Sequence, residues 1–364
     1  MPRLLHAIEI GGALICMSAA LPAAQIGFGV TNFASDQSGV APTTDPNLVN
    51  AWGLAAGAAT PWWIGNNGTG TSVVYSGAGI KQSRVVSIPG DGSVTGVSFS
   101  NIPGSFNGDA FLFASEDGTV SGWRGALGNN AETLVTGIDT NVYKGITVAT
   151  TAGNTYAYLA NFRAGTVDVL KGNPGEPNLT GNFTDPNLPA GYAPFDVQNI
   201  GGTLFVTYAV QDTDKHDDVP GLGNGIVDRF DLNGNLLGRV VTGGALNSPW
   251  GLVVAPPGFG DVGGDLLVGN FGDGMIHAYT SSGTLVETLQ DANGHPLAID
   301  GLWSLQFGNG GNAGPAGRLF FTAGPGGEMH GLFGSVDPVP EPGTWVLSAL
   351  GLVPLIILRW KLLD

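Results

Sequence analysis

Residues 250–278 read WGLVVAPPGFGDVGGDLLVGNFGDGMIHA, and this stretch decides the fold. It starts with Trp250-Gly251-Leu252, continues after a Gly- and Pro-rich connection with Leu266-Leu267-Val268-Gly269-Asn270, and turns at a glycine into Gly274-Met275-Ile276-His277-Ala278. Short apolar runs separated by Gly, Pro, Asn and Asp are typical of β-strands joined by tight turns. The stretch therefore predicts a small sheet of short strands.

The same unit recurs along the chain, with successive starts roughly 45 to 55 residues apart, the spacing of four-stranded propeller blades. The predicted inner strands start at Trp52-Gly53-Leu54, Gly96-Val97-Ser98, Gly145-Ile146-Thr147, Phe195-Asp196-Val197, Trp250-Gly251-Leu252 and Leu302-Trp303-Ser304. A single blade cannot bury its faces alone, so the units must stack. We predict an all-β fold, a six-bladed β-propeller, over residues 25–336; the 61 glycines fit its many turns.

The last unit shows only three strands and ends near Gly331-Leu332-Phe333. An unassigned strand, Phe28-Gly29-Val30-Thr31-Asn32-Phe33, lies at the start of the predicted domain. We predict that this N-terminal strand supplies the outer strand of the sixth blade, because closure in this way removes an exposed sheet edge.

Composition excludes several function classes. Charged residues make up 12% of the 364, and the formal net charge is −16, so a basic surface for nucleic acid is not expected. The single cysteine, Cys16, lies in the N-terminal segment that we predict to be removed. The mature domain would then have no thiol for a disulfide or a metal site.

Both ends of the chain are typical of targeting segments. Residues 1–24 combine Arg3, an apolar stretch and small residues, the order of a secretory signal peptide; a buried helix of the mature fold is the alternative. Residues 337–364 contain Pro340-Glu341-Pro342, an apolar run over 345–358 and then Arg359. The run is shorter than the about 20 residues of a full membrane helix, and the trailing positive charge favours a cytoplasmic end.

The C-terminal segment resembles the PEP-CTERM sorting signal, carried by Pro340, Glu341, Pro342 and Arg359. This resemblance implies export by the Sec machinery, processing by an exosortase, a transient anchor in the inner membrane through the C-terminal helix, and a final place on the surface or in the exopolysaccharide matrix of a Gram-negative bacterium. An ordinary anchor that is never processed is the alternative.

The propeller region resembles an uncharacterised family of exported bacterial proteins and, more distantly, NHL-type repeats. The blocks that carry the resemblance are NAWGLA, FLFASEDGTVSGW, APFDVQNIGGTLFVTYAVQDTDKHDDV, GGALNSPWGLVVAP, DLLVGNFGDG and IDGLWSLQFGNGG. The family brings no established activity to this chain.

Polar residues at two sets of strand ends are expected to meet at one mouth of the central channel. The candidate binding residues there are Asn66, Glu116, Asn161, Asn247, Asn270 and Asp300, and the same strand ends also carry Asn50, Asp117, Lys144, Arg163, Gln211, Asp273 and Glu328. Such a ring suits sugar hydroxyls or a hard cation such as Ca²⁺. The alternative is turn chemistry, since Asn and Asp beside Gly are what tight turns require.

The segment 212–218, Asp-Thr-Asp-Lys-His-Asp-Asp, concentrates charge in a chain that has little. Its Asp214, His216, Asp217 and Asp218 are candidate ligands for a cation, and His216 beside an aspartate is a candidate general base. A solvated loop with local ion pairs is the alternative.

Two functions remain open. No catalytic motif is evident and neither is a cofactor, apart from the Ca²⁺ that the polar ring would suit, so a non-catalytic binding protein of the cell envelope or matrix is favoured, with exopolysaccharide as a candidate ligand. The alternative is a Ca²⁺-type hydrolase, lactonase or glycan-active enzyme at the channel mouth. Convergence of three or more of these carboxylates and amides on one cation-sized point would favour the enzyme.

Overall fold

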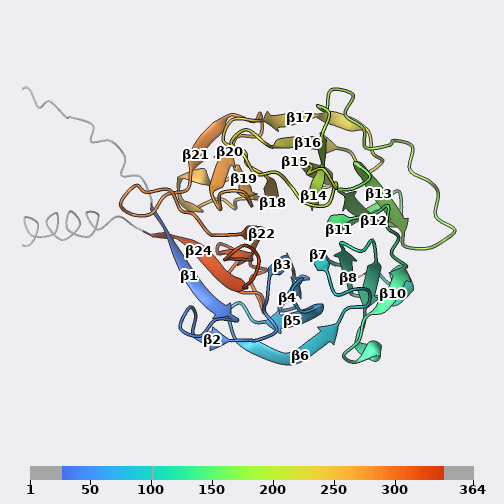
Figure 1. Cartoon of the computed structure of the whole chain (residues 1–364), viewed down its shortest axis with the longest axis horizontal. Helices are drawn as coiled ribbons and strands as arrows, with labels where there is room; N and C mark the ends of the chain where they lie inside the picture. Colours follow the sequence, from blue (N-terminus) through green and yellow to red (C-terminus); the bar gives the residue numbers. More distant parts are fainter. Residues whose placement is uncertain (1–26, 101, 340–364) are drawn as a thin grey trace, which may run out of the picture.

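The computed structural model describes residues 27–100 and 102–339. Six sheets are arranged around a central axis, and the predicted all-β six-bladed propeller is confirmed (Figure 1). Besides the strands, the described residues form three short 3-10 turns, η1 (Phe106–Gly108), η2 (Gly125–Leu127) and η3 (Gly260–Val262).

Each blade starts with its innermost strand and continues outward. Blade 1 contains β3 (Ala51–Ala55), β4 (Trp62–Asn66), β5 (Thr71–Tyr75) and β6 (Lys81–Ser87). Blade 2 contains β7 (Val94–Phe99), β8 (Phe111–Ser115), β9 (Val120–Trp123) and β10 (Glu132–Val135). Blade 3 contains β11 (Tyr143–Thr151), β12 (Asn154–Asn161) and β13 (Thr166–Lys171).

The second half of the ring follows the same order. Blade 4 contains β14 (Tyr192–Ile200), β15 (Thr203–Val210), β16 (Ile226–Phe230) and β17 (Leu236–Thr242). Blade 5 contains β18 (Pro249–Val254), β19 (Leu266–Asn270), β20 (Ile276–Tyr279) and β21 (Leu285–Thr288). Blade 6 contains β22 (Leu302–Phe307), β23 (Leu319–Ala323), β24 (Leu332–Val339), β1 (Gly27–Ser35) and β2 (Thr43–Thr44).

Burial falls from the axis to the rim. All five residues of β4, and likewise of β8 and β19, are buried, because each blade packs both faces of its second strand against neighbouring blades. The outermost strand β21 has no buried residue. Continuous apolar runs in the sequence therefore mark second strands, and polar or mixed runs mark the rim.

The sixth blade combines the two ends of the described chain. Strand β1 runs antiparallel to β24, from the pair Gly27 and Val339 to the pair Ser35 and Leu332. The short strand β2 adds to the outer edge in parallel. Strand β24 thus reaches Val339, three residues past the predicted end of the domain at residue 336.

Blade 3 departs from the prediction of four strands for every unit, since its sheet has three. The chain after β13 instead places Leu179, Phe183 and Leu188 on the apolar core between blades 3 and 4. These three side chains cover the core from an irregular segment. No fourth strand therefore pairs with β13 in this sheet.

The innermost strand of every blade carries a β-bulge at the same place. A bulge redirects the side chain that it contains. The residues within the six irregularities include Trp52, Thr95, Lys144, Phe195, Trp250 and Trp303. Four of these six are aromatic, and they pack with one another in a single buried cluster.

That cluster occupies the centre of the propeller, since its members come from five blades. The rings of Trp52 and Trp303 stack with centroids 3.7 Å apart, and Phe271 stacks on Trp303 at 3.9 Å. Phe162 and Phe195, with centroids 5.3 Å apart, complete the contact between blades 3 and 4. The axis is therefore closed by aromatic rings at this level.

Within residues 27–100 and 102–339 there is no helix with the length and apolar character needed to cross a bilayer. The predicted signal peptide at 1–24 lies outside the described residues. The predicted membrane run at 345–358 and the motif residues Pro340, Glu341, Pro342 and Arg359 lie outside them too.

Candidate functional site

Lys144 is the centre of a polar cluster at one end of the axis. It lies in the bulge of β11, and its side chain is 2% exposed. Its Nζ donates to Oε1 of Glu116, which follows β8, and lies 3.3 Å from Oδ1 of Asp217, in the loop between β15 and β16. Three different blades thus meet at one buried ammonium group.

The aromatic cluster forms the floor under this ammonium group. Nζ of Lys144 lies 5.1 Å from the ring centroid of Trp52 and 6.0 Å from that of Phe162. Burial alone would lower the pKa of Lys144, but the charges of Glu116 and Asp217 outweigh it, and the pKa is raised. The group is consequently an ammonium ion at neutral pH and not a nucleophilic amine.

Amide side chains connect the carboxylates to the floor. Asn67 donates through Nδ2 to Oε2 of Glu116 at 2.9 Å. Asn50 donates to Oε2 of Glu328 at 2.7 Å and accepts at Oδ1 from Nε1 of Trp303 at 3.1 Å. Every polar group of this set is therefore oriented by at least one neighbour before any ligand arrives.

Two residues of the cluster have strained backbones. Asn50 has φ 45° and Glu328 has φ 66°, both in the left-handed region that favours glycine. Asparagine tolerates this region, but for glutamate it is unfavourable by about 1–3 kcal/mol, and such strain is concentrated at functional sites. Burial raises the pKa of Glu328, opposed by the hydrogen bond from Asn50 and the charge of Lys144.

The predicted loop 212–218 contributes two of its four candidate ligands to this cluster. Asp217 contacts Lys144, and Nδ1 of His216 lies 2.9 Å from Oδ1 of Asp217. Backbone bonds within the loop, from Asp212 to Asp217 and from His216 to the Asp212 carboxylate, hold this shape. Asp214 is exposed, whereas Asp218 is partly buried and burial raises its pKa.

Of the predicted mouth residues, Asn50, Glu116, Lys144 and Glu328 join the cluster, whereas Asn66, Asn161, Asn247, Asn270 and Asp300 do not. Asn66 bonds to Thr71, Asn161 to Asp168, and both Asn247 and Asn270 to Asp273. Asp300 accepts from the backbone N–H of Gly326. These five side chains connect a strand end to its own turn or to a neighbouring loop.

Asn67, which the sequence did not single out, takes the place expected of Asn66. Successive side chains of a strand point to opposite faces. Asn66 therefore turns inward on its own blade, while Asn67, one residue past the strand, reaches Glu116 of the next blade. The doublet Asn66-Asn67 was the available signal.

Ligand atoms of Glu116, His216 and Asp217 lie within 4.8 Å of one another, the spacing of a candidate metal site. The two carboxylates of this set, those of Glu116 and Asp217, already contact Lys144. The ammonium group of Lys144 thus already neutralises the oxygens that a metal ion would bind. A divalent ion would have to compete with it.

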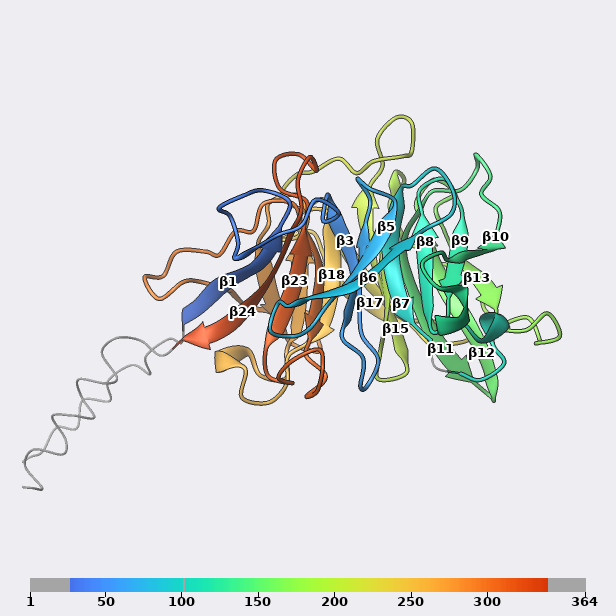
Figure 2. The same cartoon turned by 90° about the horizontal axis from the view of Figure 1, so that it is seen from below.

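Figure 2 shows this end of the molecule from the side: the loop after β15 and the loop between β23 and β24 both rise above the same edge of the strands. The two loops carry Asp217 and Glu328. We call the set Asn50, Asn67, Glu116, Lys144, His216, Asp217 and Glu328 the mouth cluster.

Two curated mimivirus proteins from Acanthamoeba polyphaga mimivirus are similar to this chain over most of its length. Uncharacterized protein R648 is 32% identical over 329 residues, which are 84% of this chain and 79% of the relative. Uncharacterized protein L690 is 31% identical over 299 residues, 76% of this chain and 78% of the relative. No family model matches the sequence.

Two solved structures resemble this chain at low identity, and the first of them shares the fold. A protein of unknown function from Bacteroides thetaiotaomicron superposes with a TM-score of 0.54 at 11% identity, covering 86% of this chain and 77% of that chain. A streptogramin B lyase superposes with a TM-score of 0.49 at 9% identity, covering 86% of this chain and 98% of that chain.

These relatives correct two predictions. The resemblance to exported bacterial proteins with a PEP-CTERM signal, and to NHL-type repeats, was wrong as an assignment of family, since the relatives are mimivirus proteins. The predicted location, an inner-membrane anchor followed by the surface of a Gram-negative bacterium, was wrong for the same reason. Both predictions rested on the short apolar and Pro-rich composition of the two chain ends. Such composition is not specific to one sorting system. At 32% identity over 84% of its length, the chain belongs to the family of the mimivirus protein R648.

Proposed function

We propose that the protein is a non-catalytic binding propeller whose mouth cluster takes the hydroxyl groups of a neutral saccharide. The observation that carries the proposal is the buried Lys144 ammonium, oriented by Glu116 and Asp217 from two other blades. A sugar hydroxyl both donates and accepts, and the Glu116 and Asp217 carboxylates, held in place by the buried ammonium group, offer it acceptors. Ordered partners lower the entropic cost of binding.

The charge of the mouth cluster limits the class of saccharide that it can bind. Three carboxylates, those of Glu116, Asp217 and Glu328, surround one ammonium group. The whole chain is acidic as well, with a formal net charge of −16. Like charges repel at close range, so a uronic or sulfated saccharide is disfavoured and a neutral one fits.

The test uses the full chain and trisaccharides as probes, namely maltotriose, cellotriose and chitotriose, with trigalacturonate as the acidic counterpart. Trp52 and Trp303 lie under the cluster, so intrinsic fluorescence reports occupancy. We expect a neutral trisaccharide to bind and trigalacturonate not to bind. Asn67→Ala removes a donor to Glu116 and should weaken binding about tenfold, the effect of losing roughly one charge-assisted hydrogen bond.

Asn154→Ala is the matched control, because Asn154 starts β12 at the opposite end of the blades and its side chain donates to the Ala152 carbonyl of its own hairpin. It should leave saccharide binding unchanged. The proposal fails if no neutral trisaccharide changes the fluorescence, or if the two asparagine variants bind equally well.

A second candidate is a metal-dependent hydrolase, favoured by the approach of Glu116, His216 and Asp217. In that case the three residues would hold a Ca²⁺-type ion, and the His216–Asp217 pair would supply a general base. The two candidates differ in what neutralises the carboxylates, an ammonium group or a metal ion, and calcium titration separates them.

A further inference from the structure

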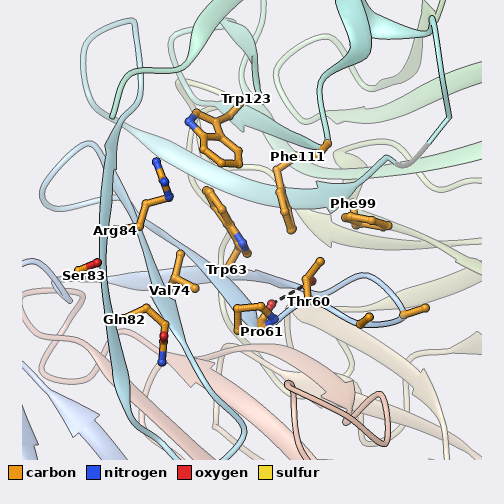
Figure 3. Close-up of a pocket in the computed structure, with 13 residues that line it drawn as sticks. Thr60, Pro61, Trp63, Val74, Gln82, Ser83, Arg84, Phe99, Phe111 and Trp123 are labelled. Atoms are coloured by element: carbon orange, nitrogen blue, oxygen red, sulfur yellow. Dashed lines mark hydrogen bonds between the residues drawn. The ribbon is translucent and has the colours of Figure 1, made fainter. Parts of the chain in front are cut away.

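A cavity of about 630 Å³ lies between blades 1 and 2, away from the mouth cluster. Its wall includes the connection between β3 and β4, residues of β6, and residues at the ends of the blade 2 strands β7, β8 and β9 (Figure 3). Small-molecule sites commonly measure about 300–1,000 Å³ and are mostly apolar with a few polar groups. Pro61 and Phe111 lie at the strand ends opposite to Asn66 and Glu116, so this cavity opens at the other end of the blades.

Aromatic rings form its apolar wall. Trp63 stacks on Phe111 with centroids 4.3 Å apart and lies 4.5 Å from Trp123, and Phe99 meets Phe111 edge-on at 5.1 Å. Val74 adds an aliphatic surface. Figure 3 shows these side chains directed at a common space. Flat rigid walls of this kind suit a planar, apolar ligand.

Arg84 is the one basic residue on the wall. Its guanidinium lies 4.9 Å from the ring centroid of Trp123, and its Nη1 donates to the carbonyl of Gly128 at 2.7 Å. Nε1 of Trp123 donates to the same carbonyl, so both side chains are fixed relative to each other.

The positive charge of Arg84 is not neutralised by the protein. Among the described residues, no carboxylate forms a salt bridge with it, whereas Arg124, Arg239 and Arg318 each pair with one or more. Arg163 and Arg229 likewise form no salt bridge among the described residues, but of these three only Arg84 lies on the wall of this apolar cavity. Guanidinium groups bind carboxylates and tetrahedral oxyanions through paired hydrogen bonds.

We propose that this cavity binds a planar, apolar small molecule that carries one anionic group, with the rings against Trp63 and Phe111 and the anion on Arg84. The chemical class is an aromatic carboxylate or sulfonate. The site is independent of the saccharide proposal, since it uses different blades and the opposite end of the strands.

The test compares two fluorescent probes on the full chain. The anionic probe is 8-anilinonaphthalene-1-sulfonate, and N-phenyl-1-naphthylamine has the same ring system without the sulfonate. We expect the sulfonate to bind at a single site, about tenfold more tightly than the neutral probe. Arg84→Gln should weaken sulfonate binding about tenfold and leave neutral-probe binding unchanged. Arg84→Lys keeps the charge but not the paired donors, so it should bind the sulfonate more weakly than the wild type and more tightly than Arg84→Gln.

Arg163→Gln is the control, because Arg163 follows β12 of blade 3, does not line this cavity, and donates to the Asp139 carbonyl. Equal affinity for the two probes, or an equal loss of both in Arg84→Gln, would overturn the proposal. If Arg84→Gln does not fold, the two probes are compared on the unchanged chain. The absence of a preference for the sulfonate there would overturn the proposal.

Discussion

Lys144→Met lowers the free energy of unfolding by about 3 kcal/mol or more, the largest effect that we expect from a single substitution at the mouth. Methionine keeps the apolar stem on Trp52 and removes only the charge. Glu116, 11% exposed, then loses its buried partner, and its repulsion with Glu328 is no longer offset. Asp217 contributes little to the loss because its side chain is 66% exposed and water replaces the contact.

Urea unfolding followed by tryptophan fluorescence measures this change at neutral pH. Lys215→Met is the matched control: it removes an exposed lysine from the same loop and should alter stability by less than about 0.5 kcal/mol. Adding Glu116→Gln to Lys144→Met should recover part of the loss, because the uncompensated charge is removed. A Lys144→Met protein as stable as the wild type would show that the ammonium group does not hold the cluster.

Asp196→Asn flattens the dependence of stability on pH between about 4 and 7. Asp196 lies in the inner strand of blade 4 and is fully buried, and its Oδ1 has no hydrogen-bond partner among the described residues. It packs so closely on Gly145 that a Cβ added there would lie 2.0 Å from that oxygen. Burial raises the pKa of Asp196 to about 7, although bonds from Val197 and Gln198 oppose the shift.

The direction of this pH dependence follows from the number of protons bound in the native and unfolded states. Between pH 4 and pH 7 the unfolded chain has released this proton and the native protein has not, so stability falls as the pH rises through that window. A shift of about three pKa units corresponds to a difference on the order of 4 kcal/mol. Asparagine stays neutral and can keep the contact with Gln198. The variant should therefore be more stable than the wild type at pH 8 and similar to it at pH 4.

Urea unfolding at a series of pH values gives the difference between wild type and variant, and that difference isolates Asp196 from other buried carboxyls such as Asp109 and Asp228, whose pKa values are raised to about 6 by burial. Asn154→Ala, which removes no titratable group, should follow the wild-type profile with at most a constant offset. Parallel profiles for wild type and Asp196→Asn would contradict a buried neutral carboxyl.

The propeller was predictable because its signals are local. Segments such as Leu266–Asn270, with an apolar run that ends at a turn, repeat with a fixed period, and each repeat reports one strand of one blade. The three-stranded blade 3 was not predictable, since Leu179 and Phe183 cover their core from an irregular segment without periodicity.

The mouth cluster was predictable only as a region. Lys144 and Glu116 were predicted at one mouth and the 212–218 loop as a separate site; that the loop reaches Lys144 depends on how three blades are placed around the axis. Asn66 was chosen over Asn67 because the sequence gives the end of a strand less accurately than its existence. The cavity beside Arg84 left no signal at all, since it arises from a gap between two packed blades.

The most direct test of the central claim, that Lys144 and not a metal ion neutralises the mouth cluster, is the melting temperature of the full chain with and without calcium. We predict no change for the wild type at millimolar Ca²⁺. Lys144→Met should melt at a higher temperature with Ca²⁺ than without it, because Glu116, His216 and Asp217 are then free to ligate the ion. A calcium-dependent rise in the wild type that a chelator reverses would contradict the account and favour the metal-dependent enzyme.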